Sequence, residues 1–165
     1  MSDRRPTSSR RALLAATAAF AVIGSAPAQA QGAGDSAQLA TIMEKYAAAL
    51  RSNNAEALVA LYAPNGVFMR EDMPAVVGRD ALSKAYREVF ASLKLDLAFT
   101  IQETEVAGDM AWLRSTSTGR IKILATGAES SNSFNELVVF RREAGAWKIR
   151  SYIYASNRPG PGPAK

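Results

Sequence analysis

The stretch from residue 134 to residue 155 constrains the fold most, because it has the pattern of a long antiparallel hairpin. Its two arms, FNELVVF and AWKIRSYIYA, are rich in β-branched and aromatic residues, and residues 143–145 lie between them as the reversal. Side chains alternate along a strand, so the first arm places one carboxylate, Glu136, in a row with Phe134, Val138 and Phe140. A carboxylate therefore interrupts an otherwise apolar face.

The second arm also lacks a purely polar side. Strict alternation predicts Trp147, Ile149 and Ile153 on one face and Tyr152 and Tyr154 on the other, beside Lys148 and Arg150. A sheet that is apolar on both faces needs a cover on each. We expect helices on one face and a second copy of the chain on the outer face, which makes the protein a homodimer.

The first thirty residues have the pattern of a cleaved export signal. Four arginines precede an apolar run of 13 residues, 12–24, and Ala28-Gln29-Ala30 is a small-x-small cleavage pattern. The run is shorter than the roughly 20 residues that span a bilayer, so we expect no stable membrane anchor. The segment Ser9-Arg10-Arg11-Ala12-Leu13-Leu14 resembles a twin-arginine signal, and an ordinary secretory signal is the alternative. Either route predicts cleavage near Ala30 and a periplasmic or secreted protein.

Charge and composition exclude several classes of function. Removing residues 1–30 leaves 16 basic and 14 acidic residues, a net charge of +2, with no basic cluster to bind nucleic acid. The chain has no cysteine and no histidine, which excludes disulfide scaffolds, cysteine nucleophiles and Ser-His-Asp triads. We expect no metal and no cofactor, and a metal-dependent oxygenase subunit is disfavoured because it would need histidine ligands.

Helices come first along the chain and strands afterwards. The spacing of apolar residues predicts a helix that begins at Asp35 or Ser36 and contains Tyr46, a short helix over residues 55–62, and a third helix from Arg79. Short strand 67–69, strands over 95–102 and 110–122, and the hairpin follow. Residues 158–165 have nothing apolar to bury, and we expect this tail to be disordered.

This order predicts an α+β fold in which three N-terminal helices pack on the concave face of a strongly curved antiparallel sheet. Such a cone-shaped layer leaves an open end between the helices and the long strands. A cavity for a small molecule is the natural consequence.

Six motifs, in this order and spacing, resemble the nuclear transport factor 2-like superfamily, and within it the SnoaL-like and ketosteroid isomerase-like bacterial proteins. They are Tyr46-Ala-Ala-Ala-Leu50, Leu61-Tyr62-Ala-Pro64, Val67-Phe68-Met69, Val77-Gly78-Arg79-Asp80-Ala81-Leu82, Gly108-Asp109-Met110-Ala111 and Gly145-Ala146-Trp147-Lys148-Ile149. The resemblance implies a single domain over residues 36–157 with a cystatin-like fold. It does not imply one function, because the superfamily includes isomerases, cyclases, dehydratases and non-catalytic binding proteins.

The resemblance also implies candidate catalytic residues. Tyr46 stands where the isomerases have their oxyanion-hole tyrosine, and Glu136 falls close to their protonated aspartic acid. The position of the isomerase base is occupied by Arg70, which cannot accept a proton at ordinary pH. Glu71 or Asp72 could supply a relocated base.

Each candidate has a structural alternative. Tyr46 could be a core tyrosine with its hydroxyl bonded to a neighbour, and Glu136 could form a buried salt bridge with Arg70 or Arg114. The two arginines could equally bind an anionic ligand. The residues expected to line the cavity are Met69, Arg70, Phe90, Trp112 and Arg114.

Two functions remain open on the sequence. The first is an exported protein that binds an apolar, polyketide-like or steroid-like molecule without conventional steroid isomerase activity. The second is an acid/base enzyme of the isomerase, cyclase or dehydratase type, in which Tyr46 and Glu136 stabilise a developing oxyanion.

Overall fold

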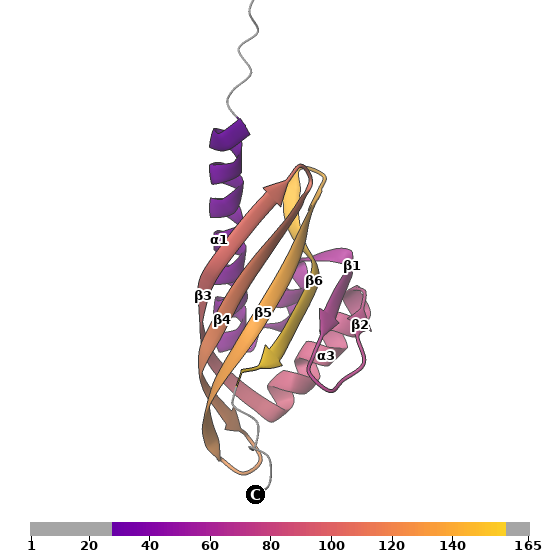
Figure 1. Cartoon of the computed structure of the whole chain (residues 1–165). Helices are drawn as coiled ribbons and strands as arrows, with labels where there is room; N and C mark the ends of the chain where they lie inside the picture. The colour runs from indigo at the N-terminus through magenta and orange to yellow at the C-terminus, as the bar shows by residue number, and fades with distance from the viewer. Residues whose placement is uncertain (1–27, 158–165) are drawn as a thin grey trace, which may run out of the picture.

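The computed structural model of this protein describes residues 28–157, and their side chains from residue 32 on. Four long strands and one pair of shorter strands form its sheet. The strand order is β2-β1-β6-β5-β4-β3. The strands are β1 (Tyr62–Met69), β2 (Val76–Val77), β3 (Leu93–Ala107), β4 (Met110–Ile123), β5 (Glu129–Glu143) and β6 (Ala146–Ser156). Strands β3 to β6 run as an antiparallel meander, as Figure 1 shows. The pairing of β1 with β6 is parallel, which the sequence pattern did not predict.

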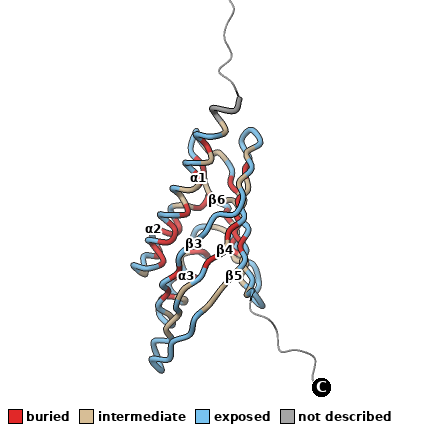
Figure 2. Tube along the Cα trace, turned by 60° about the vertical axis from the view of Figure 1, so that its left-hand side comes forward, coloured by how far each residue is buried: buried red, intermediate tan, exposed pale blue. Residues whose placement is uncertain are grey.

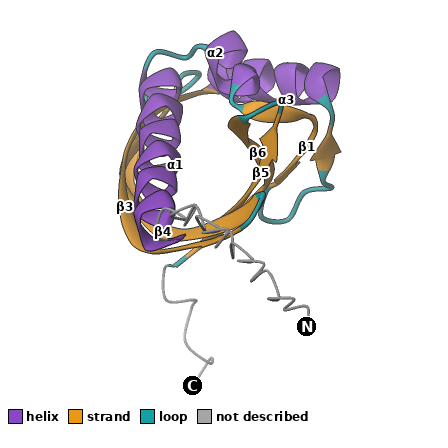
Figure 3. Cartoon of the chain, turned by 90° about the horizontal axis from the view of Figure 1, so that it is seen from above, coloured by secondary structure: helices purple, strands orange, loops and turns teal. Residues whose placement is uncertain are grey.

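Three helices cover the concave side of this sheet, as predicted: α1 (Ala28–Arg51), α2 (Ala55–Ala60) and α3 (Arg79–Ser92). Seen from above, the sheet curves from β3 round to β1, while α1 packs along β3 and α3 lies near β1 (Figure 3). Asn54 caps α2 by accepting the N–H of Ala57 at 2.9 Å, a contact that typically stabilises a helix by about 1 kcal/mol. The α+β cone expected from the element order is therefore confirmed.

Helix α1 begins earlier than its predicted N-cap at Asp35 or Ser36. Asp35 lies inside the helix and is 6% exposed, and its carboxylate bonds to the β5–β6 hairpin instead of capping its own helix. One carboxylate oxygen accepts from Arg142 Nη2 at 2.8 Å and from Trp147 Nε1 at 3.0 Å. Trp147 also lies under the Arg142 guanidinium, 4.2 Å from ring centroid to Cζ. These contacts tie α1 to the β5–β6 hairpin.

The core lies between α1, α2, α3 and the inner face of the sheet. Figure 2 shows that buried segments of the helices and strands face one another. The largest fully buried side chains are Tyr62, Tyr86, Phe140, Leu39, Leu58, Leu82, Leu113, Ile149 and Val138. Nothing in the described part of the chain suggests a second core.

The faces predicted for Tyr152, Ile153 and Tyr154 are wrong, because β6 contains a β-bulge. Val139 pairs with Ser151, but Phe140 pairs with Ile149, so Arg150 is an extra residue that reverses the alternation. Trp147 and Ile149 face inward before the bulge. Tyr152 and Tyr154 face inward after it, and Ile153 points outward, 41% exposed. Two tyrosines are thereby brought to the concave side.

Gly119 lies in β4 at a point where the strands approach closely. A Cβ at this position would lie 1.9 Å from the backbone oxygen of Asp96 in β3, so only glycine fits. Leu97, its partner in the ladder, faces the core. The close approach involves β3, the strand against which α1 packs.

The predicted export signal falls almost entirely outside the described residues, and so does the predicted disordered tail at 158–165. The predicted cleavage point after Ala30 lies in the first turn of α1. None of the helices in residues 28–157 is both long and apolar enough to cross a bilayer.

Candidate functional site

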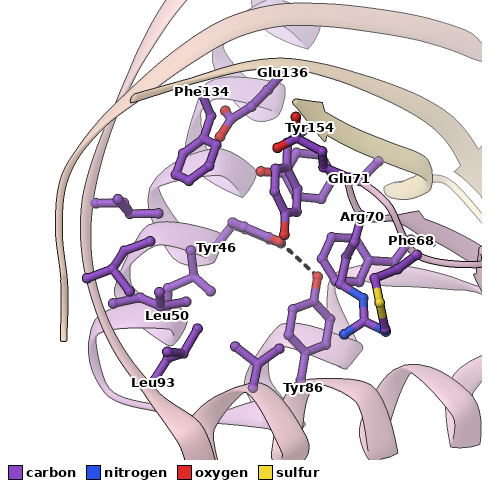
Figure 4. A pocket seen from close by; sticks show the side chains of 16 residues that line it. Tyr46, Leu50, Phe68, Arg70, Glu71, Tyr86, Leu93, Phe134, Glu136 and Tyr154 are labelled. Carbon is purple, nitrogen blue, oxygen red and sulfur yellow. Dashed lines mark hydrogen bonds between the residues drawn. The ribbon is translucent and has the colours of Figure 1, made fainter. Parts of the chain in front are cut away.

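A cavity of about 250 Å³ opens between the inner face of the sheet and helices α1 and α3 (Figure 4). Most of its wall is apolar: Leu50, Phe68, Met73, Val89, Leu93, Leu95, Leu97, Ile121 and Phe134. The polar part of its wall consists of Tyr46, Tyr86, Tyr152, Tyr154, Glu136, Arg70 and Glu71. The cavity predicted from the layered fold is therefore present, and it combines a hydrocarbon surface with a few polar groups, as small-molecule sites do.

Glu136 projects from β5 into this cavity and is 4% exposed. Two hydroxyls of the neighbouring strand β4 donate to its carboxylate, Ser115 to Oε2 and Ser117 to Oε1, each at 2.7 Å. Burial raises the pKa of Glu136 above its usual 4.5, and the hydrogen bonds from Ser117, Ser115 and Tyr152 oppose that rise without cancelling it. A carboxyl group of this kind takes up a proton more readily than one in water.

The predicted salt bridge of Glu136 is wrong for both proposed partners. Among the described residues Glu136 forms no ion pair, and Arg114 instead lies on the outer face of β4, where its Nε is 3.3 Å from Glu103 Oε2. The reason is the alternation of β4. Ser115 and Ser117 point inward beside Glu136, so Arg114 must point outward.

Three buried tyrosines share a hydrogen-bonded chain in which Tyr86 is central. Its hydroxyl oxygen is 2.8 Å from that of Tyr46 and 2.7 Å from that of Tyr62. Burial is the largest cause that raises the pKa of each of these tyrosines, and of Tyr152, well above 10.0, so all four hydroxyls stay protonated. The Tyr46 hydroxyl is thus bonded to a neighbour, as the structural alternative expected, and Tyr46 also lines the cavity.

Arg70 follows the last residue of β1 and lines the cavity as predicted. Its Nε is buried and has no hydrogen-bond partner in the described part of the chain. Its Cζ lies 5.9 Å from the centre of the Phe68 ring. Figure 4 shows Arg70 and Phe68 on one side of the cavity and Leu50 and Leu93 on the other.

The two candidates for a relocated base differ in position. Glu71 lines the cavity, where its Oε2 accepts the backbone N–H of Ser156 at 3.0 Å. Asp72 is exposed, has a positive φ of 57°, and does not line the cavity. Of the two candidates, Glu71 is therefore the carboxylate that lines the cavity.

Four of the predicted lining residues lie elsewhere. Met69 follows Phe68, which takes the inward position in β1 and lines the cavity. Phe90 is buried in the core beside the cavity, while its neighbour Val89 lines it. Phe90 packs against Tyr86, with ring centroids 6.2 Å apart. Trp112 and Arg114 share the outer face of the sheet, as their predicted common face requires, but that face points away from the cavity.

The sequence reading missed several residues that complete the site: Ser115, Ser117, Tyr86 and Tyr152. Tyr86 lies on the helix predicted from Arg79, where apolar spacing does not distinguish a cavity residue from a core residue. The two serines depend on the register of β4 and β5, which sets Ser115 opposite Glu136 and which the local sequence pattern does not specify. Tyr152 could not be placed from that pattern either, because the β6 bulge reverses its face.

Taken together, these groups can donate hydrogen bonds to an oxygen atom in an otherwise apolar cavity. Tyr46, Tyr152 and a protonated Glu136 are donors of that kind. Proton abstraction would depend on Glu71, since Arg70 cannot act as a base. No group of three or more His, Cys, Asp or Glu side chains in residues 28–157 is arranged to hold a metal ion.

Comparisons with known proteins agree with this architecture. The SnoaL-like domain family matches residues 43–151. A ketosteroid isomerase-like protein from Erwinia carotovora atroseptica SCRI1043 is 30% identical over 74% of this chain and 96% of its own, with a TM-score of 0.71. No curated protein matches.

More distant solved structures share the fold alone. A nuclear transport factor 2-like protein with a cystatin-like fold from Novosphingobium aromaticivorans is 20% identical, with a TM-score of 0.64 over 81% of this chain and 88% of its own. A proposed dehydratase of the same superfamily from Streptomyces avermitilis is 18% identical, with a TM-score of 0.67 over 77% of this chain and 99% of its own.

Proposed function

Because the chain belongs to the SnoaL-like family of the nuclear transport factor 2-like superfamily, we propose that it binds a compact, largely apolar carbonyl compound of polyketide or steroid-like type. The observation that carries this proposal is the apolar cavity with the buried carboxyl group of Glu136 in its wall. Ser115 and Ser117 hold that carboxyl in place from the neighbouring strand. A bound carbonyl oxygen would meet protonated donors in a site of low polarity.

The size of the cavity limits the ligand. About 250 Å³ is somewhat below the roughly 300–1,000 Å³ of pockets that hold drug-sized molecules. One or two fused rings fit this volume better than four. Of the polyketide and steroid-like range, the smaller members are therefore the better candidates.

Binding without conventional steroid isomerase chemistry is the first form of the proposal. Arg70 occupies the position where the resemblance places the isomerase base, and guanidinium does not accept a proton at ordinary pH. The 30% identical protein is called ketosteroid isomerase-like. This similarity supports a carbonyl compound as the ligand of this chain but does not support the isomerase reaction.

An acid/base enzyme is the second form, and the arrangement of Tyr46 and Glu136 favours it. Both line the same cavity, Tyr46 keeps its proton, and the raised pKa of Glu136 favours the neutral acid. The two could donate hydrogen bonds to a carbonyl oxygen as it becomes an enolate, while Glu71 removes the α-proton. Glu71 would have to exchange its bond with the Ser156 N–H for the substrate.

One experiment tests both forms with 2-tetralone, a neutral two-ring ketone with exchangeable α-protons. Calorimetry on wild type should show binding, Leu93→Trp should abolish it by filling the cavity, and Leu137→Trp on the outer face should not. Absence of wild-type binding, or equal binding by Leu93→Trp, contradicts the proposed site.

Exchange of the ketone's α-protons for deuterium, followed by nuclear magnetic resonance, separates the enzyme from the binder. An enzyme accelerates exchange above the buffer rate, and Tyr46→Phe should then slow it by about 100-fold, the scale of one lost oxyanion donor. Binding without accelerated exchange identifies a binding protein.

Export and dimer formation belong to the same proposal. The arginine-rich start, the apolar run and the Ala28-Gln29-Ala30 pattern support a periplasmic or secreted protein. Sequencing the N-terminus of the exported protein checks this, with Gln31 as the expected first residue. Exposed apolar side chains on the outer sheet face, among them Leu137 and Ile153, support a homodimer through that face.

A further inference from the structure

Arg70 brings a positive charge into the cavity that no acidic side chain in the described part of the chain neutralises. Its guanidinium forms no ion pair there, and its buried Nε–H has no acceptor. A buried N–H group without an acceptor is uncommon in folded proteins, because its desolvation is unfavourable. The contact with the face of Phe68, at 5.9 Å, is a weak substitute for an oxygen acceptor.

The carboxylates that share the cavity with Arg70 already have other partners. Glu136 accepts a hydroxyl hydrogen bond on each oxygen, from Ser115 on Oε2 and from Ser117 on Oε1. Glu71 accepts the backbone N–H of Ser156 and is exposed to solvent. Neither carboxylate therefore satisfies the guanidinium.

The pKa of Tyr154 depends on two neighbouring charges, those of Arg70 and Glu71. Burial raises the pKa of Tyr154, the positive charge of Arg70 lowers it, and the negative charge of Glu71 raises it. Tyr154 keeps its proton and is a neutral donor beside Arg70. A guanidinium and a phenol hydroxyl together are suited to a planar anionic group, since guanidinium N–H groups match the two oxygens of a carboxylate.

We propose that the ligand of this cavity is a carboxylic acid, whose carboxylate binds Arg70 and whose one- or two-ring body lies against the apolar wall. The inference rests on the proposed function and adds the substrate class to it. Leu50 and Leu93 lie across the cavity from Arg70, so the ring system reaches the hydrocarbon wall while the acid group stays on the guanidinium (Figure 4). The part of the cavity wall that contains Glu136 and Tyr46, where the proposed function places a carbonyl oxygen, is then free for a second oxygen of the same molecule.

The test compares naphthalene-2-carboxylate with naphthalene-2-carboxamide, which has nearly the same shape and no charge. At pH 7, calorimetry on wild type should show the carboxylate binding about tenfold or more tightly than the amide. Arg70→Met keeps the apolar stem of the side chain and should bring the two affinities within about threefold, with the amide affinity little changed. Arg70→Lys keeps the charge without the planar fork and should retain part of the preference.

Arg114→Met is the matched control, because Arg114 is an exposed arginine on the opposite face of the sheet. It should keep the full preference for the carboxylate. Melting curves of all variants show whether each is folded before affinities are compared, and Arg70→Lys replaces Arg70→Met if the latter is unfolded.

Three results would overturn the inference, and they separate it from the proposed function. Equal binding of acid and amide by wild type rejects the acid ligand and leaves the cavity as a binding site. A preference that survives in Arg70→Met, or that Arg114→Met removes, rejects Arg70 as the anchor. Failure of wild type to bind either naphthalene probe rejects the acid ligand, and it rejects the proposed function as well only if wild type also fails to bind 2-tetralone.

Discussion

At the scale of single residues, Glu136 is the least expected feature of this chain. Its burial raises its pKa above 4.5, so between that value and the higher folded pKa the folded chain holds a proton that the unfolded chain has lost. The contribution of this group to stability is therefore complete below about pH 4.5 and declines as the pH rises through that window. Hydrogen bonds from Ser117, Ser115 and Tyr152 limit the loss. At neutral pH the chain keeps this carboxyl at some cost in stability, as functional sites often do.

At the scale of elements, two devices build the site from strands that alternation alone would place differently. The β6 bulge brings Tyr152 and Tyr154 to the cavity and removes Ile153 from it. The Asp35 contacts then fix α1 against the β5–β6 hairpin, so the helix that carries Tyr46 has a defined position relative to Glu136. Both devices position side chains of the site without lining it.

The Asp35 contacts make a prediction about acid stability. Hydrogen bonds from Arg142, and then from Trp147, lower the pKa of Asp35 below 3.8 despite burial. The stabilisation is therefore present above about pH 3.8 and is lost as the pH falls through the lower folded pKa. Asp35→Asn should lower the melting temperature at pH 7 by several degrees, and the difference from wild type should shrink below pH 4.

Asp109→Asn is the control for this prediction. Asp109 also approaches Arg142, at 3.4 Å, but its side chain is 78% exposed, and exposed ion pairs contribute little. Asp109→Asn should melt close to wild type. Asp35→Asn with an unchanged melting temperature at pH 7 would show that these contacts do not hold α1.

At the scale of the whole molecule, the order of elements was enough to predict the fold. Helical spacing up to residue 93 and alternation after it indicated the layers, and the six motifs indicated the family, which the match over residues 43–151 confirms. The site was predicted less completely. Tyr46, Glu136 and Arg70 line the cavity, but Trp112 and Arg114 do not, because periodicity shows which residues share a face and not which face turns inward.

The residues that hold Glu136 depend on long-range register, which local patterns do not specify. Ser115 reaches Glu136 because β4 and β5 pair in one particular register, and Tyr152 reaches it because of one extra residue in β6. Neither the register nor the bulge has a distinct signal in the residues around it. The alternative salt bridge of Glu136 with Arg114 was wrong because alternation places Ser115 and Ser117, and not Arg114, on the inner face of β4.

The outer face of the sheet predicts the assembly of the molecule. Met110, Leu137 and Ile153 are each more than 40% exposed there. Light scattering at about 100 μM should show a dimer, and Leu137→Lys should shift it toward monomer by placing a charge in the interface. Val77→Lys, an exposed position on β2 at the edge of the sheet, is the control and should not change the mass. A wild-type monomer at this concentration would contradict the interface.

The central claim is that an acid group is buried in the wall of a ligand cavity, and the carboxyl carbon of Glu136 reports on it directly. Nuclear magnetic resonance of glutamate-labelled wild type should show one carboxyl signal, absent in Glu136→Gln, whose titration midpoint lies above 4.5. A midpoint at or below 4.5 for that signal would show a solvated or ion-paired carboxylate and would contradict the account.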